Sequence, residues 1–437
     1  MLNILVNAYA VSPIWGSEPG MGWNWVSNLA RYCNLFIITE GEWQKEIECS
    51  IEAALNGDLS KDKNPTGLTR EQAEHMHFYY SNVTPVVRTM CWNQGDWRFY
   101  KFYREWQINT LEIAQRILKE EKIDIVHQLN MIGFREPGML WKIQDKPFVW
   151  GPIGGMELMP TSYLKGESLK VQFKERLKNF LNTLQRNYQG RVIKALNRAD
   201  GLAAATKGCY EHIKNYHHKD VVLINETGCF VNQDSTQSAI DTSNRFHRKE
   251  FDLMWVGKFD FRKQLGIGLK TMALLKDVPE IKLHVIGSGY EADVKRYYEL
   301  ADRLGLKNTV AFHGSLKNTE VHEMMRRSDA FFFTSIMDAT STVVLEAIGA
   351  GLPVICYDTC GFGPIVDDSI GRKIKVSNPE QAASDFARII RELYADRDTL
   401  AEMSKHCIER QQSVSWDSNA KKMVALYEKA IESFKHK

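Results

Sequence analysis

Residues 330–357 read AFFFTSIMDATSTVVLEAIGAGLPVICY, and their alternation of apolar and polar segments predicts a strand, a loop, a short helix and a second strand. The hydroxyl residues at 340–342 are N-cap candidates for the apolar segment 343–348, which glycines then close. A helix start aimed out of the carboxyl end of a buried strand is a natural anion site, because unpaired backbone N–H groups and the positive dipole end meet there.

Two carboxylates belong to the same stretch. Asp338 lies in the loop, and Glu346 lies about a turn into the expected helix. A carboxylate does not bind an anion, so an acid beside an anion site is expected to contact another part of the ligand. A pair at this spacing lets one carboxylate face a sugar while the other accepts hydrogen bonds from ribose hydroxyls. The stretch therefore predicts a nucleotide-sugar site, with Thr340, Ser341 and Thr342 close to the diphosphate.

Strand-like and helix-like segments alternate along the chain, which predicts an α/β fold with two Rossmann-like domains and a cleft between them. We expect the first domain over residues 1–232 and the second over 250–410, joined by the polar stretch 232–249. The expected strands of the first domain lie near residues 3–9, 34–39, 123–127, 147–150, 201–205 and 221–224, with a helix at 20–31.

Composition is that of an ordinary globular protein, with 44% hydrophobic and 25% charged residues among 437. The net charge of +2 gives no overall attraction to nucleic acid, so no nucleic-acid partner is expected. The eight cysteines show no metal-type spacing. No run approaches the ~18 apolar residues needed to span a bilayer, so a cytoplasmic protein, soluble or peripheral, is expected.

The spacing of Asp338 and Glu346, with Gly349-Ala350-Gly351-Leu352-Pro353 after them, resembles the E-x7-E element of family 4 retaining glycosyltransferases, which have the two-domain GT-B fold. Other segments that resemble the family follow in its order, namely residues 3–7, 16–20, 254–258, 262–263, 284–289 and 310–316. The resemblance implies a hexosyltransferase that uses a nucleotide-diphosphate sugar, and a last helix within 411–437 that completes the first domain.

The resemblance also implies roles for single residues. Arg262 and Lys263 would neutralise the departing diphosphate, Asp338 would act on the sugar, and Glu346 would hold the ribose. Further donor-binding residues are expected in the first glycine loop and in the turns after strands of the second domain, namely Gly16, Ser17, Gly287, Ser288, Gly289 and Leu316.

Two positions depart from the family's pattern. Asp338 stands where the family usually has Glu, so its carboxylate must approach the sugar more closely or act through water. The family tends to carry Asp-x-x-His-x-His at a strand end, whereas here Asp124 is followed by His127 but the second histidine is absent. His127 is a candidate catalytic residue, and a hydrogen-bonded histidine at a strand end is the alternative interpretation.

No Ser-His-Asp or Cys-His order stands out. None is needed if, as the resemblance implies, the phosphate of the donor assists the attack of the acceptor from the same face. Asp396-Arg397-Asp398 fits the Asp-x-Asp metal pattern of glycosyltransferases with the other main fold, but its charged, helical surroundings indicate a solvated surface. We therefore expect neither a cofactor nor an essential metal.

Residues 165–198 carry nine basic and two acidic residues, with apolar residues at roughly helical spacing. A basic amphipathic helix of this kind can lie on an anionic membrane and bring the site to a lipid-linked acceptor at the inner face. The alternative is an ordinary domain helix with a solvated basic face.

The sequence therefore predicts transfer of a sugar to a saccharide or lipid-linked saccharide acceptor, in the biosynthesis of a surface polysaccharide or glycolipid. Two alternatives stay open. A nucleotide-sugar 2-epimerase of the same fold would need internal acid and base groups and no acceptor, and a non-catalytic nucleotide-sugar-binding subunit would be expected to lack Arg262, Lys263 or Glu346.

Overall fold

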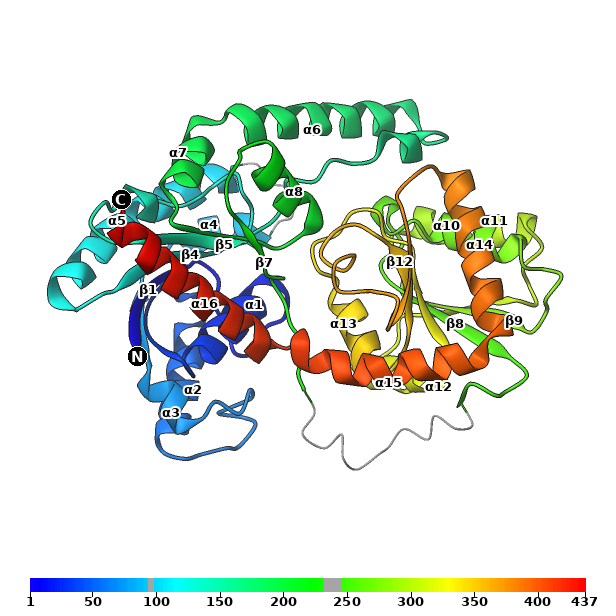
Figure 1. Cartoon of the computed structure of the whole chain (residues 1–437), viewed down its shortest axis with the longest axis horizontal. Coiled ribbons are helices and arrows are strands. Elements are labelled where there is room, and N and C mark those ends of the chain that lie inside the picture. The colour runs from blue at the N-terminus through cyan, green and yellow to red at the C-terminus, as the bar shows by residue number, and fades with distance from the viewer. Residues whose placement is uncertain (93–97, 232–244) are drawn as a thin grey trace.

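Two parallel β-sheets lie side by side in the computed structural model, which describes residues 1–92, 98–231 and 245–437 (Figure 1). The strand order is β3-β2-β1-β4-β5-β6-β7 in the first sheet and β10-β9-β8-β11-β12-β13 in the second. Each order runs outward from the first strand in one direction and then in the other, as in doubly wound nucleotide-binding sheets. The predicted α/β fold with two Rossmann-like domains is confirmed.

The first sheet is formed by β1 (Leu2–Ala8), β2 (Cys33–Thr39), β3 (Met76–Tyr80), β4 (Ile125–Asn130), β5 (Phe148–Ile153), β6 (Gly201–Ala204) and β7 (Val222–Leu223). The helices around it are α1 (Ser17–Leu29), α2 (Gln44–Leu55), α3 (Arg70–Glu74), α4 (Pro85–Trp92), α5 (Phe99–Glu120), α6 (Leu169–Tyr188), α7 (Gly190–Arg198), α8 (Lys207–Asn215) and α16 (Trp416–Lys435). Buried apolar clusters lie on both faces of this sheet.

The second sheet is formed by β8 (Phe251–Val256), β9 (Ile281–Ile286), β10 (Val310–Gly314), β11 (Ala330–Phe333), β12 (Val354–Tyr357) and β13 (Gly371–Ile374). Its helices are α10 (Leu265–Ala273), α11 (Glu291–Arg303), α12 (Asn318–Arg327), α13 (Thr342–Gly349), α14 (Pro379–Ala395) and α15 (Arg397–Ser413). The segment that sets the position of the site, β11-loop-α13-β12, has the order that the sequence predicts. Most of the expected connection, residues 232–244, lies outside the described residues.

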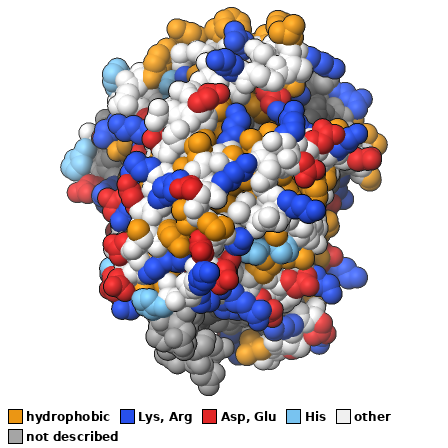
Figure 2. All heavy atoms as spheres, turned by 90° about the vertical axis from the view of Figure 1, so that its right-hand side faces the viewer, with side chains coloured by type: hydrophobic (Ala, Val, Ile, Leu, Met, Phe, Trp, Pro, Cys, Tyr) orange, Lys and Arg blue, Asp and Glu red, His pale blue; other side chains and the backbone are white. Residues whose placement is uncertain are grey.

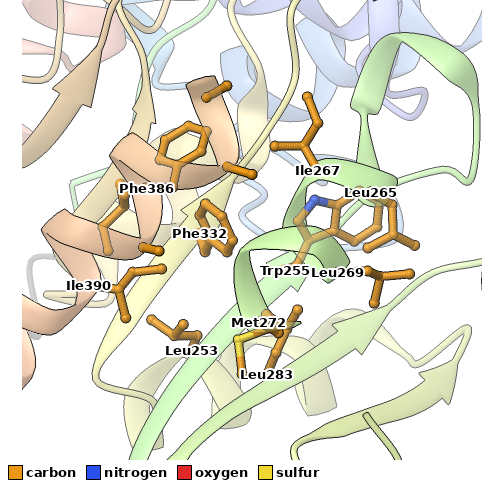
Figure 3. Close-up of a cluster of buried hydrophobic side chains, with 14 of the residues drawn as sticks. Leu253, Trp255, Leu265, Ile267, Leu269, Met272, Leu283, Phe332, Phe386 and Ile390 are labelled. Carbon is orange, nitrogen blue, oxygen red and sulfur yellow. The ribbon is translucent and has the colours of Figure 1, made fainter. Parts of the chain in front are cut away.

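The core of the second sheet fixes the end of β11 (Figure 3). Phe332 of β11 packs edge-on against Phe386 of α14, with ring centroids 5.0 Å apart. Just beyond the strand, Thr334 accepts a hydrogen bond of 2.9 Å from the Trp255 indole N–H of β8. Burying aromatic and aliphatic side chains of this size stabilises the fold by about 2 kcal/mol each. The loop after β11 therefore starts from a rigid point.

The chain crosses between the two halves twice, and the crossing segments are hydrogen-bonded to each other. The Cys229 N–H donates to the Val414 carbonyl at 2.9 Å, and the Trp416 N–H donates to the Cys229 carbonyl at 3.2 Å. A Cβ atom at Gly228 would come within 2.5 Å of the Trp416 nitrogen, so this close approach requires glycine. Beyond the crossing, α16 packs against α1 and β6, with Tyr427 fully buried.

The expected helix at 20–31 begins earlier, at Ser17, because Glu18 and Pro19 form its first turn. The strand expected at 123–127 begins at Ile125 and continues to Asn130. Among the described residues, no helix combines the length and the apolar content that a membrane span requires.

Candidate active site

A cavity of about 1280 Å³ lies between the two halves, beyond the carboxyl ends of their central strands. From the first half it is lined by the loop after β1 and the start of α1, by Ile132, and by the crossing segment from Glu226 to Phe230. From the second half it is lined by Lys263, by one side of α12, and by residues of the segment from Asp338 to Ala350. The sequence predicts this edge of a parallel sheet as the ligand site.

The amino end of α13 opens into the cavity. Ser341 is its N-cap residue, but its side chain makes no capping hydrogen bond to the helix. Ser341, Thr342, Leu345 and Glu346 all line the cavity. The first N–H groups of the helix are thus available to an anion, and the dipole of the helix favours negative charge there.

Glu226 of the crossing segment binds Thr340, the residue before the N-cap of this helix. Its carboxyl group accepts hydrogen bonds from the Thr340 N–H at 2.5 Å and the Thr340 hydroxyl at 2.7 Å. The neighbouring Asn225 amide donates to the Thr340 hydroxyl and to the Gly361 carbonyl, both at 2.8 Å. Burial, with a smaller contribution from the nearby Glu18, raises the pKa of Glu226 to about 7, although the hydrogen bonds from Thr340 act to lower it. The crossing segment therefore fixes the loop that leads into α13.

Lys263 and Asp338 form an ion pair at the second-half wall of the cavity. Both side chains are mostly buried, with 15% and 22% of their surfaces exposed. The backbone places them together, because the Thr334 hydroxyl donates to the Lys263 carbonyl at 2.8 Å and the Ile336 N–H donates to the Arg262 carbonyl at 3.0 Å. The ammonium group also lies 5.0 Å from the centre of the Phe333 ring.

Arg262 does not line the cavity, although it precedes Lys263 directly. Its guanidinium pairs with Asp260 at 2.9 Å, and half of its side chain is exposed. The same Asp260 accepts the Arg262 N–H in a short 3-10 turn, Phe261–Lys263, and the two basic side chains have different partners, Asp260 for Arg262 and Asp338 for Lys263. Of the predicted basic pair, the structure brings only Lys263 to the cavity.

Glu346 lies one turn into α13 and faces the cavity opposite α12. Partial burial raises its pKa, and the nearby His322 opposes this effect. His322 lines the cavity together with Thr319, Glu323 and Arg326 of the same helix. This part of the wall offers a carboxylate for hydroxyl groups, a nearby imidazole and, on the same helix as the imidazole, a guanidinium.

The first-half wall contains Gly16 and Ser17, the residues expected to bind the donor, and also Glu18. Their position on the wall opposite α13 leaves the donor-binding role a prediction. The Glu18 carboxylate accepts the Ile132 N–H at 3.0 Å, and burial raises its pKa to about 7. Among the described first-half residues that line the cavity, Glu18 and Glu226 carry the ionisable side chains, and no lysine or arginine is present. This wall is suited to neutral hydroxyl groups and unsuited to a second anion.

His127 lies in the core, away from the cavity. Its Nε2–H donates to the Gly151 carbonyl at 2.7 Å, so its Nδ1 accepts the Tyr427 hydroxyl, also at 2.7 Å. Burial lowers its pKa to about 4. Both ring nitrogens are occupied and the ring is fully enclosed, so the structure places His127 as a core residue between β4 and α16 and does not support the catalytic role expected for it.

Four predicted donor-binding residues also lie outside the lining of the cavity: Gly287, Ser288, Gly289 and Leu316. The turn after β9 instead packs on the loop after β8. A Cβ atom at Gly287 would come within 1.9 Å of the Gly257 carbonyl oxygen, and the Phe259 N–H donates to the Ser288 carbonyl at 2.8 Å. Leu316 packs against a buried apolar cluster of the second half. These glycines allow close backbone packing.

The Asp396-Arg397-Asp398 motif is a helix junction. Asp396 is the N-cap of α15 and accepts the Thr399 N–H at 3.0 Å, while the Asp398 side chain is 93% exposed. Within the described ranges, no group of three or more His, Cys, Asp or Glu side chains is arranged to hold a metal ion.

Residues 236–413 match the family model described as glycosyl transferases group 1. Among characterised relatives, the lipopolysaccharide glucosyltransferase WaaG of Escherichia coli is 32% identical over 27% of this chain and 30% of its own length. A D-inositol 3-phosphate glycosyltransferase of Streptomyces coelicolor is 26% identical over 42% of this chain and 41% of its own. The matches thus span less than half the length of these relatives.

Solved structures match over nearly the whole chain. Anabaena HepE in complex with UDP has a TM-score of 0.59 at 13% identity and covers 97% of this chain and 99% of its own. A crystal structure of WaaG has a TM-score of 0.54 at 17% identity, and the match covers 96% of this chain and 98% of the WaaG chain. The fold is GT-B. At these identities the comparison establishes the fold alone, and the family model matches the part of the chain that carries Lys263, Asp338 and Glu346.

Proposed function

We propose that this chain is a glycosyltransferase that moves a hexosyl group from a nucleotide-diphosphate sugar to a hydroxyl of a saccharide or lipid-linked saccharide, with retention of the anomeric configuration. One observation carries the proposal: a single cavity combines the open amino end of α13 with Lys263, Asp338 and Glu346, and the first domain forms its other wall. The similarity of residues 236–413 to group 1 glycosyl transferases supports the same conclusion.

The donor would lie along the second-half wall. Its diphosphate fits the amino end of α13 and the Lys263 ammonium group, which together neutralise the charge of the leaving group. Glu346 would accept the ribose hydroxyls, and His322 lies close enough to affect its pKa. When phosphate oxygens attract Lys263, its bond to Asp338 weakens, and the carboxylate of Asp338 becomes available to hydroxyls of the donor sugar.

In the proposed reaction, the bond from the anomeric carbon to the β-phosphate oxygen breaks and a bond to the acceptor oxygen forms on the same face of the sugar. The acceptor proton passes to the departing phosphate oxygen, and the nucleoside diphosphate leaves. No enzyme nucleophile takes part. Lys263 and the N–H groups of α13 stabilise the negative charge that develops on the diphosphate, and this is the main contribution of the enzyme.

The acceptor would bind between the first-half wall and the donor sugar. Because that wall contributes Glu18 and Glu226 without a basic residue, we expect the acceptor group at the reaction centre to be an uncharged sugar. Trp15 and Ile14 lie at the rim of the cavity with 60% and 55% of their surfaces exposed. Both offer apolar surface to the face of a sugar ring.

The decisive experiment titrates the full chain with UDP-, GDP-, ADP- and dTDP-sugars and measures the shift in melting temperature. A matching donor should raise the melting temperature of the wild type, by less in Lys263→Ala and Glu346→Ala, and fully in Glu299→Ala, an exposed acid of α11. Because Arg262 lies outside the cavity lining, Arg262→Ala should lose less binding than Lys263→Ala. A donor that binds all of these variants equally would refute the assigned site.

Chemistry is tested by incubating the identified donor with candidate saccharides and following the anomeric proton by NMR. A product with the anomeric configuration of the donor supports the proposal, and an inverted product overturns its stereochemistry. Conversion of the donor without any acceptor would instead show the epimerase alternative. Tight binding without turnover, over a broad acceptor panel, would favour the non-catalytic subunit.

A further inference from the structure

The helix α6 lies along one edge of the molecule (Figure 1), and the segment that leads into it contacts the second domain. Just before it, Tyr163 and Leu164 are buried in the core of the second domain, and the Tyr163 hydroxyl lies 3.2 Å from that of Tyr357. Glu167 pairs with Arg296 of α11 at 2.5 Å. The carboxyl end of α6 leads into α7 on the first domain.

The side of α6 that faces the protein is polar. The Asn179 amide donates to the Met159 carbonyl at 2.8 Å and accepts the Met159 N–H at 2.9 Å. Asn182 donates to the Glu157 carbonyl at 2.8 Å, and Arg186 donates to the Met156 carbonyl at the same distance. The helix is therefore held by hydrogen bonds to the backbone of residues 156–159, and apolar packing contributes little to this face.

The outward side of α6 is apolar. Between 40% and 83% of the surface of each of the following side chains is exposed: Leu169, Phe173, Leu177, Phe180, Leu181, Leu184 and Tyr188. At 100° per residue these positions fall within an arc of about 120°, so they form one continuous stripe along the helix. Soluble proteins rarely expose a contiguous apolar surface of this extent unless it binds something.

Basic residues flank the stripe. Lys170, Lys174 and Lys178 follow one edge at the same helical spacing and Arg176 lies near the other, and all four are exposed. The acid within α6, Glu175, is 15% exposed and lies 3.8 Å from Lys178. In Figure 2, hydrophobic and basic side chains meet at the upper rim of the molecule, where α6 lies in Figure 1.

We propose that α6 docks this protein on an anionic lipid bilayer, with the apolar stripe in the acyl-chain boundary and the flanking lysines at the lipid phosphates. An exposed apolar arc bordered by cations is complementary to a negatively charged interface. A second copy of the chain fits less well, because two α6 stripes facing each other would bring their lysine rows together. This inference goes beyond the proposed reaction, since lipid binding requires neither donor nor acceptor.

The test is co-sedimentation of the full chain with vesicles of phosphatidylcholine alone or with about one third phosphatidylglycerol. We expect binding to the anionic vesicles that weakens as salt is raised. The double variant Phe173→Ser/Phe180→Ser should lose at least tenfold in affinity, because each phenylalanine loses the free energy of transfer out of water. Lys174→Gln/Lys178→Gln should lose about 25-fold, from roughly fivefold per lysine at an anionic surface.

Matched controls separate the stripe from general surface effects. Tyr290→Ser removes an aromatic side chain that is 74% exposed on the second domain, and Lys295→Gln with Lys405→Gln removes two exposed lysines elsewhere. These controls should bind vesicles like the wild type. The proposal is overturned if the wild type does not bind anionic vesicles at low salt, if the α6 variants bind as well as the controls, or if sedimentation velocity shows a dimer that the Phe173→Ser/Phe180→Ser change abolishes.

Discussion

Breaking the Lys263–Asp338 ion pair separates its contribution to stability from its role in binding. In Lys263→Met, the Asp338 carboxylate stays in a site where 22% of its surface is exposed and loses its charged partner. Leaving a largely buried polar group unpaired costs about 1–3 kcal/mol. Adding Asp338→Asn removes the stranded charge, and we expect it to restore about 1–2 kcal/mol of that loss.

The Lys263 and Asp338 variants should rank differently by affinity for the nucleoside diphosphate than by stability. A charged hydrogen bond to phosphate is worth about 1.5–3 kcal/mol, so Lys263→Met should weaken binding roughly 10- to 100-fold, and the double variant should not recover it. Asp338→Asn alone should bind the nucleotide at least as tightly as the wild type, because Lys263 no longer has to leave its partner. The same variant should turn over more slowly if Asp338 acts on the donor sugar.

Thermal melting ranks the variants by stability. Isothermal titration with the nucleoside diphosphate of the preferred donor ranks them by nucleotide affinity. The melting temperature should be lowest for Lys263→Met and intermediate for the double variant. If Asp338→Asn lowers the affinity for the nucleoside diphosphate as much as Lys263→Met does, the two residues act as one structural unit. The assignment of Lys263 to the diphosphate would then be wrong.

Four further predictions concern the crossing segment, the core histidine and metals. Because burial raises the pKa of Glu226 from 4.5 to about 7, the stability that it contributes is complete below pH 4.5 and falls by about 3 kcal/mol as the pH rises through 7. Glu226→Gln should keep both contacts to Thr340 without this loss, so melting curves at pH 5 to 8.5 should diverge in its favour, and parallel curves would contradict the argument. Gly228→Ala should lower the melting temperature, because its Cβ would lie 2.5 Å from the Trp416 nitrogen, and an unchanged value would show that the crossing is loosely packed. Because the pKa of His127 is lowered from 6.5 to about 4, its contribution is present above pH 6.5 and is lost as the pH falls towards 4, so His127→Gln should flatten the acid side of the stability profile and leave the pH dependence of transfer unchanged. Transfer should also survive EDTA, and a loss restored by Mg²⁺ or Mn²⁺ would refute the expectation that no metal is needed.

The parts of the site that could be predicted are those that the chain encodes locally. The loop, helix start and carboxylates of residues 338–346 belong to one strand-loop-helix unit, so spacing along the sequence is enough to place Asp338 and Glu346 near each other. The same holds for the α/β fold, because each strand and helix shows its own periodicity. Lys263 is expected together with Arg262, from the resemblance of the segment after the first strand of the second domain to the family's basic pair, and Lys263 alone lines the cavity.

The parts of the site that could not be predicted depend on contacts between segments far apart in the sequence. Glu226 meets Thr340 across 114 positions, and Glu18 meets Ile132 across the same number, so neither carboxylate could be assigned by spacing. The one local signal for Glu226 is its place just after the strand expected at 221–224. His127 shows the opposite error. A strand-end histidine resembles a catalytic residue in sequence, but its ring turns into the core because α16, some 300 positions later, covers it.

The helix α6 shows why an amphipathic pattern does not by itself identify the buried side. Apolar residues at helical spacing usually mark the face that packs on the domain. Here the backbone of residues 156–159 presents carbonyl and N–H groups to the helix, and only polar side chains such as Asn179 and Asn182 can satisfy them. The hydrogen bonds therefore fix the polar side inward, and the apolar stripe is left on the surface. The exposed side of α6 carries the basic residues and the apolar stripe together.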